Sequence, residues 1–305
     1  MKVSSSPHIR NSRTTQKIYL FVVIALVPAA LAGIYFFGQK SLYIIFVTVI
    51  SGMLFDLLMQ RLFGVRLHFN CSALITSLLL ALILPPTVPL WLPVIGVIFA
   101  IGIAKYPFGQ GNNIFNPALV ARVFLAVSFP VFMSSYVSPD TLTSASPLTV
   151  AKIDGYGTLV ESFGLESSLY SALFVGNRSG SVGETCSFLI IAGGLFLVLV
   201  RVIDWRIPFF YLFSVACLAL VLGSDVLFHL MAGGLLLGAF FMATDYVTSP
   251  ITKKGRIIFA VGCGVLTVIL RLYSSYPEGV AFSILLMNAA TPLIDRFTVP
   301  RPFGR

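Results

Sequence analysis

The chain has 305 residues, of which 57% are hydrophobic and 10% are charged, and its mean hydropathy is +0.96. Soluble proteins carry about 25% charged residues, so this composition excludes a soluble enzyme, a disordered scaffold and a disulfide-stapled secreted domain. The net charge of +9 comes from basic residues scattered between apolar runs, a pattern that argues against nucleic acid as a partner and favours a membrane protein.

Apolar runs of about 20 residues, the length that crosses a bilayer as a helix, predict an all-α integral membrane protein with about ten transmembrane helices. A polar and basic segment, 1–17, precedes them; we assign it to the cytoplasm and do not expect a cleavable signal peptide. Short connections containing Gly, Pro or Ser separate the runs. The predicted spans are 18–37, 41–60, 71–86, 89–106, 117–135, 186–203, 208–223, 226–243, 257–274 and 279–294.

The distribution of basic residues predicts the orientation of these spans. With a cytoplasmic N-terminus, 16 of the 20 Lys and Arg residues fall inside, Arg122 among them. The four that fall outside are Lys40, Lys152, Arg178 and Arg271. Because cytoplasmic loops carry an excess of Lys and Arg, both termini are expected in the cytoplasm.

A polar loop of about 50 residues, 136–185, divides the spans into a first half, 1–135, and a second half, 186–305. Each half holds five spans, and an odd number means that the second half runs opposite to the first, as in an inverted repeat. His68 opens a short span that ends in prolines, and His229 opens a Gly-rich span at a similar position in its half. Chance similarity between apolar stretches is the alternative explanation.

The sequence Asp140-Thr-Leu-Thr-Ser-Ala-Ser146 begins the polar loop. Taken alone, it is a hydroxyl-rich turn in which Ser146 caps a helix that starts at Pro147. It also resembles the acceptor motif to which a flavin transferase attaches FMN through a phosphodiester. The resemblance makes Ser146 the acceptor and Asp140, Thr143 and Ser144 its motif partners, although Thr is usual at the acceptor position. An acceptor of this kind is expected to be an exposed hydroxyl on a flexible turn.

Six further segments resemble one family along the whole chain. Together they are similar to the NqrB/RnfD family, which joins the RnfD component of the Rnf electron-transport complex with the NqrB component of the sodium-pumping NADH:quinone oxidoreductase. NqrB proteins usually carry a longer N-terminal extension than this chain has, so the RnfD type is favoured here. The segments are Ser-Pro-His-Ile-Arg at 6–10, Gly-Asn-Asn-Ile-Phe-Asn-Pro-Ala at 111–118, Gly-Ser-Val-Gly-Glu-Thr at 180–185, Asp-Trp-Arg-Ile-Pro at 204–208, the run at 240–250, and Pro-Leu-Ile-Asp at 292–295.

The resemblance implies a subunit of an ion-translocating ferredoxin:NAD⁺ oxidoreductase complex, which moves Na⁺ or H⁺ and is not active as a single chain. It implies a covalent FMN on the extracytoplasmic side and a second, non-covalent flavin, such as riboflavin, within the membrane. The expected partners are the other Rnf subunits, a flavin transferase and membrane lipid. The expected location is the bacterial or archaeal cytoplasmic (inner) membrane. The alternative is a secondary transporter or channel without a redox cofactor, which would not need the acceptor motif.

Two asparagines before the fifth span are candidates for the second flavin. The amides of Asn113 and Asn116 match the alternating donors and acceptors of a flavin pyrimidine ring, and the family places them near the intramembrane flavin. The alternative for Asn116 is a helix cap followed by Pro117. The cysteines and histidines lack metal-ligand spacing, so we expect no metal site, and we assign no catalytic residue.

Three acidic residues at or near membrane depth are candidates for an ion path, because carboxylates there are costly and are functional by default. They are Asp56, Asp245 and Asp295. Ordinary pairing is the alternative for each: Asp56 with Arg61, and the other two with Arg256 or Arg296.

Overall fold

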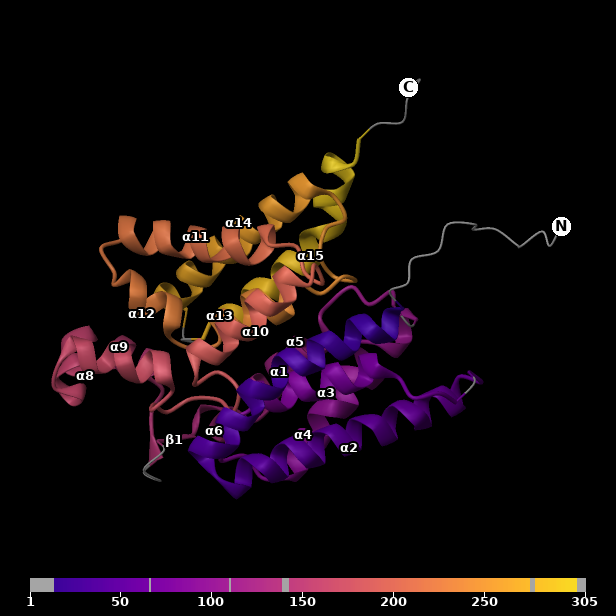
Figure 1. Ribbon diagram of the computed structural model, residues 1–305, viewed down its shortest axis with the longest axis horizontal. Helices are drawn as coiled ribbons and strands as arrows, with labels where there is room; N and C mark the ends of the chain where they lie inside the picture. The colour runs from indigo at the N-terminus through magenta and orange to yellow at the C-terminus, as the bar shows by residue number, and fades with distance from the viewer. Residues whose placement is uncertain (1–13, 66, 110, 139–142, 275–277, 301–305) are drawn as a thin grey trace.

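A computed structural model describes residues 14–65, 67–109, 111–138, 143–274 and 278–300. It consists of two helical bundles that lie side by side, the first coloured indigo to magenta and the second orange to yellow, with α8 and α9 projecting at one end (Figure 1). Within the described residues the only sheet is a pair of two-residue strands. The expectation of a helical membrane protein is therefore consistent with the fold.

The first bundle is built from long apolar helices and shorter broken ones. Prolines at 85 and 86 follow the end of α3, and a π-helical segment, η1, continues α4. The elements are α1 (Thr15–Phe37), α2 (Gln39–Leu62), α3 (Cys71–Ile83), α4 (Trp91–Val97), η1 (Ile98–Ile103), the 3₁₀ turn η2 (Tyr106–Phe108), α5 (Pro117–Ser128) and α6 (Pro130–Ser134).

Residues 136–185, expected to be a polar loop, contain folded structure. Leucines from three helices form a small core of their own with Phe228 and Ala232 of the second bundle, because the apolar residues recur at helical spacing within the polar segment. Strand β1 (Tyr136–Val137) pairs antiparallel with β2 (Thr143–Ser144). The helices are α7 (Pro147–Ile153), α8 (Tyr156–Phe163) and α9 (Glu166–Val175).

The second bundle contains a helix broken in its middle. The predicted span 226–243 is interrupted at Ala-Gly-Gly, 232–234, and a second π-helical segment, η3, follows the break. The elements are α10 (Ser187–Leu199), α11 (Arg206–Val221), α12 (Val226–Met231), α13 (Leu235–Leu237), η3 (Gly238–Met242), α14 (Lys253–Tyr273) and α15 (Val280–Thr298).

In the part of the chain that the structure describes, five helical segments are long and apolar enough to cross a membrane: α1, α2, the run Trp91–Phe108, α14 and α15. Four shorter apolar helices, α3, α5, α10 and α11, accompany them. The two bundles meet where α1 packs on α10 and α5 packs on α15. At the first contact the backbones touch, because a Cβ at Gly193 would clash with the carbonyl oxygen of Ala25.

The assignment of Arg122 to the cytoplasmic side was wrong. Arg122, in the middle of α5, donates a hydrogen bond of 2.6 Å to the carboxylate of Glu278 and one of 3.3 Å to the hydroxyl of Tyr136. Both partners fall on the side assigned to the exterior. Since Arg122 is buried, it serves as an interior ion-pair partner, and counting it as a topology signal was an error.

Candidate functional site

A cavity of about 280 Å³ lies between the two bundles. Its walls come from the start of α1, from α3, from the segment between η1 and α5, from the end of α10 and the turn after it, and from η3 and the segment that follows it. The two sequence segments at 111–118 and 240–250 therefore meet here, although they are far apart in the chain. Its volume is close to the lower end of the range of about 300 to 1,000 Å³ that small-molecule sites occupy.

Asn116 links the two bundles beside this cavity. Its side-chain oxygen accepts hydrogen bonds from the backbone N–H groups of Ala118 (3.1 Å) and Leu119 (3.4 Å) and so caps α5, which begins at Pro117. Its amide nitrogen donates to the carbonyl oxygen of Met242, at 3.2 Å, in the other bundle. The helix-cap prediction for Asn116 is confirmed, and the same side chain also lines the cavity.

Asn113 is buried in the cavity wall, where its amide nitrogen donates to the carbonyl oxygen of Phe115 at 3.2 Å. The lining of the cavity also includes the apolar side chains of Leu197, Phe240 and Phe241. A lining that combines amide and apolar side chains suits a flat heteroaromatic ring with a polar edge. The residues present thus fit a flavin ring.

Two π-helical segments bring opposite charges to this cavity. Lys105 follows η1 after one residue, and Asp245 follows η3 after two, and both line the cavity. Wide π-turns inside α-helices are rare and frequently mark functional sites. Sequence reasoning missed Lys105 as a site residue, although a lysine at the end of an apolar run was the signal that could have found it.

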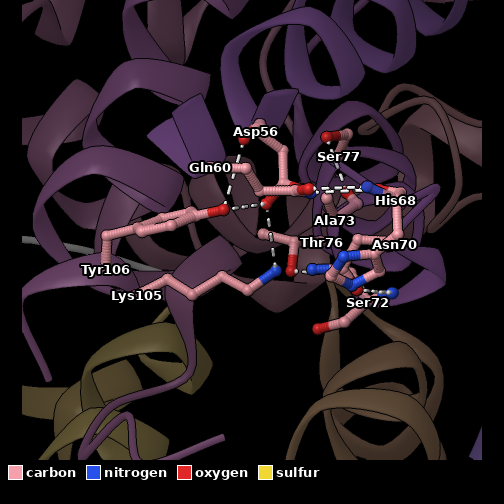
Figure 2. Close-up of polar contacts among 10 residues, drawn as sticks. All are labelled: Asp56, Gln60, His68, Asn70, Ser72, Ala73, Thr76, Ser77, Lys105 and Tyr106. Atoms are coloured by element: carbon pink, nitrogen blue, oxygen red, sulfur yellow. Dashed lines mark hydrogen bonds and ion pairs between the residues drawn. The ribbon is translucent and has the colours of Figure 1, made fainter. Parts of the chain in front are cut away.

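Asp56 and Lys105 form a buried ion pair, with Lys105 Nζ 3.7 Å from Asp56 Oδ1. Figure 2 shows Lys105 and Tyr106 reaching Asp56 from the same side. The hydroxyl of Tyr106 donates to Asp56 Oδ1 at 3.2 Å, and the amide of Gln60 donates to Asp56 Oδ2 at 2.7 Å. The alternative in which Asp56 pairs with Arg61 is wrong, because α2 directs the carboxylate into the bundle and leaves Arg61 exposed.

The expected pairings of the other two acids are also different in the structure. Asp245 accepts from Thr248 Oγ1 at 3.4 Å, whereas Arg256 binds Asp204 at 2.7 Å. Asp295 accepts from the backbone N–H of Ile251 at 3.1 Å and holds the segment before α14. Among the described residues no ion pair joins Asp295 to an arginine. The cavity therefore brings Asp245 near Lys105, and Asp295 lies outside its lining.

Ser146 is the N-cap of α7, as predicted. Its Oγ accepts from the backbone N–H of Thr149 at 3.3 Å and lies 2.9 Å from the hydroxyl of Thr149. The expectation of an exposed hydroxyl was wrong, because Ser146 is only 6% exposed. Two contacts hold the start of α7 against the rest of the protein. Leu148 contacts the second bundle, and the hydroxyl of Ser179 donates to Ala145 O at 2.7 Å.

The other residues of the acceptor motif are placed only in part. Thr143 and Ser144 form β2, opposite Val137 and Tyr136, whereas Asp140 lies outside the described residues, as does the segment 6–10.

Two buried arginines stabilise the broken helix near this loop, and sequence reasoning placed both on the exterior without a role. Arg178 donates to the carbonyl of Met231 at 2.9 Å, and Arg271 donates to that of Ala232 at 2.9 Å. The last carbonyls of a helix have no intrahelical partner, so the guanidinium groups satisfy the end of α12.

These features define a multi-pass helical membrane protein with a cavity between two bundles, lined by apolar and polar residues. The model of the NQR2, RnfD, RnfE family matches residues 2–304, and the chain belongs to this family.

Curated relatives cover almost the whole chain. The D subunit of the proton-translocating ferredoxin:NAD(+) oxidoreductase complex of Clostridium ljungdahlii is 45% identical over 99% of this chain and 96% of the relative. The D subunit of the Na(+)-translocating ferredoxin:NAD(+) oxidoreductase complex of Acetobacterium woodii is 45% identical over 100% and 95%. The D subunit of the ion-translocating oxidoreductase complex of Stutzerimonas stutzeri is 41% identical over 97% and 94%.

Proposed function

We propose that this chain is the flavin-carrying membrane subunit of an ion-translocating ferredoxin:NAD⁺ oxidoreductase complex of the Rnf type. The names of the relatives that match over nearly their full length support this assignment. The proposal that the chain binds a flavin rests on the cavity where the segments at 111–118 and 240–250 meet. The proposed partners are the other Rnf subunits, whose electron carriers would deliver electrons to this chain or accept electrons from it.

The cavity is the proposed place of the non-covalent flavin, riboflavin or a related molecule. A bound flavin supplies chemistry that passes one or two electrons. Asn113 and Asn116 would bind its polar edge through their amides. Phe240 and Phe241 would cover the ring and exclude water, which strengthens the electrostatic contacts inside.

Ser146 is the proposed attachment point for covalent FMN, through its oxygen and the FMN phosphoryl group. The motif residues Asp140, Thr143 and Ser144 are proposed to be recognised by the flavin transferase. Because Ser146 is buried as the cap of α7, the transferase must act before α7 packs onto the second bundle, or α7 must open to admit it.

Asp56, Asp245 and Asp295 are proposed to lie on the ion path. Carboxylate oxygens suit a hard cation such as Na⁺, and the same groups can carry a proton. Relatives with equal identity to this chain are named proton-translocating and Na(+)-translocating, so overall identity does not choose between the two ions.

The proposed topology has ten spans, with both termini in the cytoplasm of a bacterial or archaeal cell and the 136–185 segment outside its cytoplasmic (inner) membrane. An inverted repeat of 1–135 and 186–305 is supported by the third span of each half, where α3 is short and α12 is broken before α13. Exposed apolar side chains such as Leu31, Phe46 and Leu54 would face lipid.

The alternative function is a secondary transporter or channel without a redox cofactor. The two are separated by Ser146→Ala, compared with the matched control Ser146→Thr, in cells that contain a flavin transferase. After denaturing electrophoresis, the wild-type and Ser146→Thr bands are expected to fluoresce under ultraviolet light, whereas the Ser146→Ala band is expected to be dark. A dark wild-type band favours the transporter, and a fluorescent Ser146→Ala band moves the acceptor to Ser144 or Thr143.

A further inference from the structure

Lys105 carries a buried charge that the protein leaves without a hydrogen-bond partner. The residue is only 3% exposed, and its ammonium has no hydrogen-bond acceptor among the described residues. Its distance of 3.7 Å from Asp56 is too long for a hydrogen bond. An ammonium has three donors, and leaving them unsatisfied in the interior is costly. Lys105 also lines the cavity, so a rotation of its flexible side chain can bring these unused donors to a ligand there.

Asp56 is held in place without the help of Lys105. Both of its carboxylate oxygens accept hydrogen bonds, from Tyr106 and from Gln60. Gln60 is itself fixed by the backbone of His68, which donates to its oxygen at 2.9 Å and accepts from its nitrogen at 3.0 Å. The carboxylate is thus held by hydrogen bonds that do not involve Lys105 (Figure 2), whereas the ammonium ends a four-carbon stem that can rotate.

We infer that Lys105 couples the two proposed sites: its ammonium neutralises Asp56 when the cavity flavin is oxidised, and turns to the flavin when an electron arrives. This inference rests on the proposed flavin in the cavity. Lys105 is a positioning residue for the ion and a charge partner for the flavin.

The charges balance at each step. The electron comes from a one-electron carrier of another subunit and adds one negative charge at the cavity. Lys105 turns toward that charge, and Asp56, still held by Gln60 and Tyr106, loses its counter-charge. An uncompensated carboxylate in the interior is unfavourable, so Asp56 binds one cation, Na⁺ or a proton. When the electron leaves, Lys105 returns to Asp56 and displaces that cation, and no covalent bond changes except that of a carried proton.

The test measures the midpoint potential of the non-covalent flavin in the full-length chain carrying Ser146→Ala, so that acid-extractable flavin is the only flavin expected. Lys105→Met removes the positive charge and is expected to lower the potential. Asp56→Asn frees the ammonium for the flavin and is expected to raise it. Each change should alter the ratio of reduced to oxidised flavin at a fixed potential by at least about tenfold, which is about 59 mV for one electron.

A cation titration adds a second readout. Without either substitution at the pair, more Na⁺ or a lower pH is expected to raise the potential, because reduction is linked to cation binding. Both variants should lose this dependence. Asp245, Tyr19 and Tyr246 also line the cavity and are left unchanged. Lys254→Met, the same substitution at an exposed lysine, is the matched control and should leave both readouts unaltered.

The outcomes separate this inference from the proposed function. If the parent chain holds no non-covalent flavin, the proposed function and the inference both fail. If the flavin is present but the potentials of the two variants shift in the same direction, or both keep the cation dependence, only the inference is overturned. If Lys105→Met does not retain flavin, Lys105→Arg is expected to retain it, and Asp56→Asn then decides through the direction of its shift.

Discussion

Asn116 is predicted to join the two bundles and to shape the cavity between them. Asn116→Ala removes the cap of α5, which is worth about 0.5–2 kcal/mol. It also removes the shorter of two hydrogen bonds to the carbonyl of Met242, which keeps the one from the backbone N–H of Asp245 at 3.5 Å; one such bond contributes about 0.5–1.5 kcal/mol. Together these losses predict a decrease of about 1–3.5 kcal/mol in the free energy of unfolding. Asn116→Asp keeps the capping oxygen but buries a carboxylate that faces the carbonyl oxygen of Met242, so its decrease should be at least as large.

The assay is a denaturant titration of the detergent-solubilised chain, with the acid-extractable flavin measured on the same samples. Both variants are expected to hold less non-covalent flavin than the wild type, because each loses the amide that faces the cavity. The reasoning would be refuted if Asn116→Ala unfolded within about 0.5 kcal/mol of the wild type, below the smallest expected cap loss, and retained its flavin.

Two further predictions concern stability. Burial acts to raise the pKa of Asp204, but the backbone N–H of Arg206 and the guanidinium of Arg256 outweigh it and hold the pKa below its ordinary value. The interactions of Asp204 with Arg206 and Arg256 therefore contribute fully to stability above about pH 4, and this contribution is lost as the pH falls through the lowered pKa. The melting temperature of the wild type should consequently fall in acid more than that of Asp204→Asn. Gly193→Leu should prevent α1 from packing on α10, because even a Cβ clashes with the Ala25 carbonyl; the matched Gly157→Leu, at an open position, should leave the melting temperature nearly unchanged.

Composition and local chemistry predicted much of this fold. The apolar content and the apolar runs indicated a helical membrane protein, and the Asn-Pro and Ser-Pro pairs at 116 and 146 predicted helix caps that the structure confirms. These features depend on neighbours within a few residues, which a sequence displays directly.

The contacts that build the site depend on tertiary packing and could not be predicted in the same way. Lys105 lies far from Asp56 in the chain, and only the packing of η1 against α2 brings them together. The burial of Ser146 follows from the packing of α7 on the second bundle, which its hydroxyl-rich sequence did not reveal. Arg122 was misplaced because a rule for basic residues in loops was applied to one inside a helix.

The attachment of FMN is the claim that a single measurement tests most directly. Cleavage after basic residues should release the peptide 123–152 from the chain purified from its native membrane. We expect this peptide to be heavier than its sequence mass by one FMN residue, and we expect fragmentation to place the added mass on Ser146. An unmodified 123–152 peptide, from cells that contain the flavin transferase, would contradict covalent attachment at this serine.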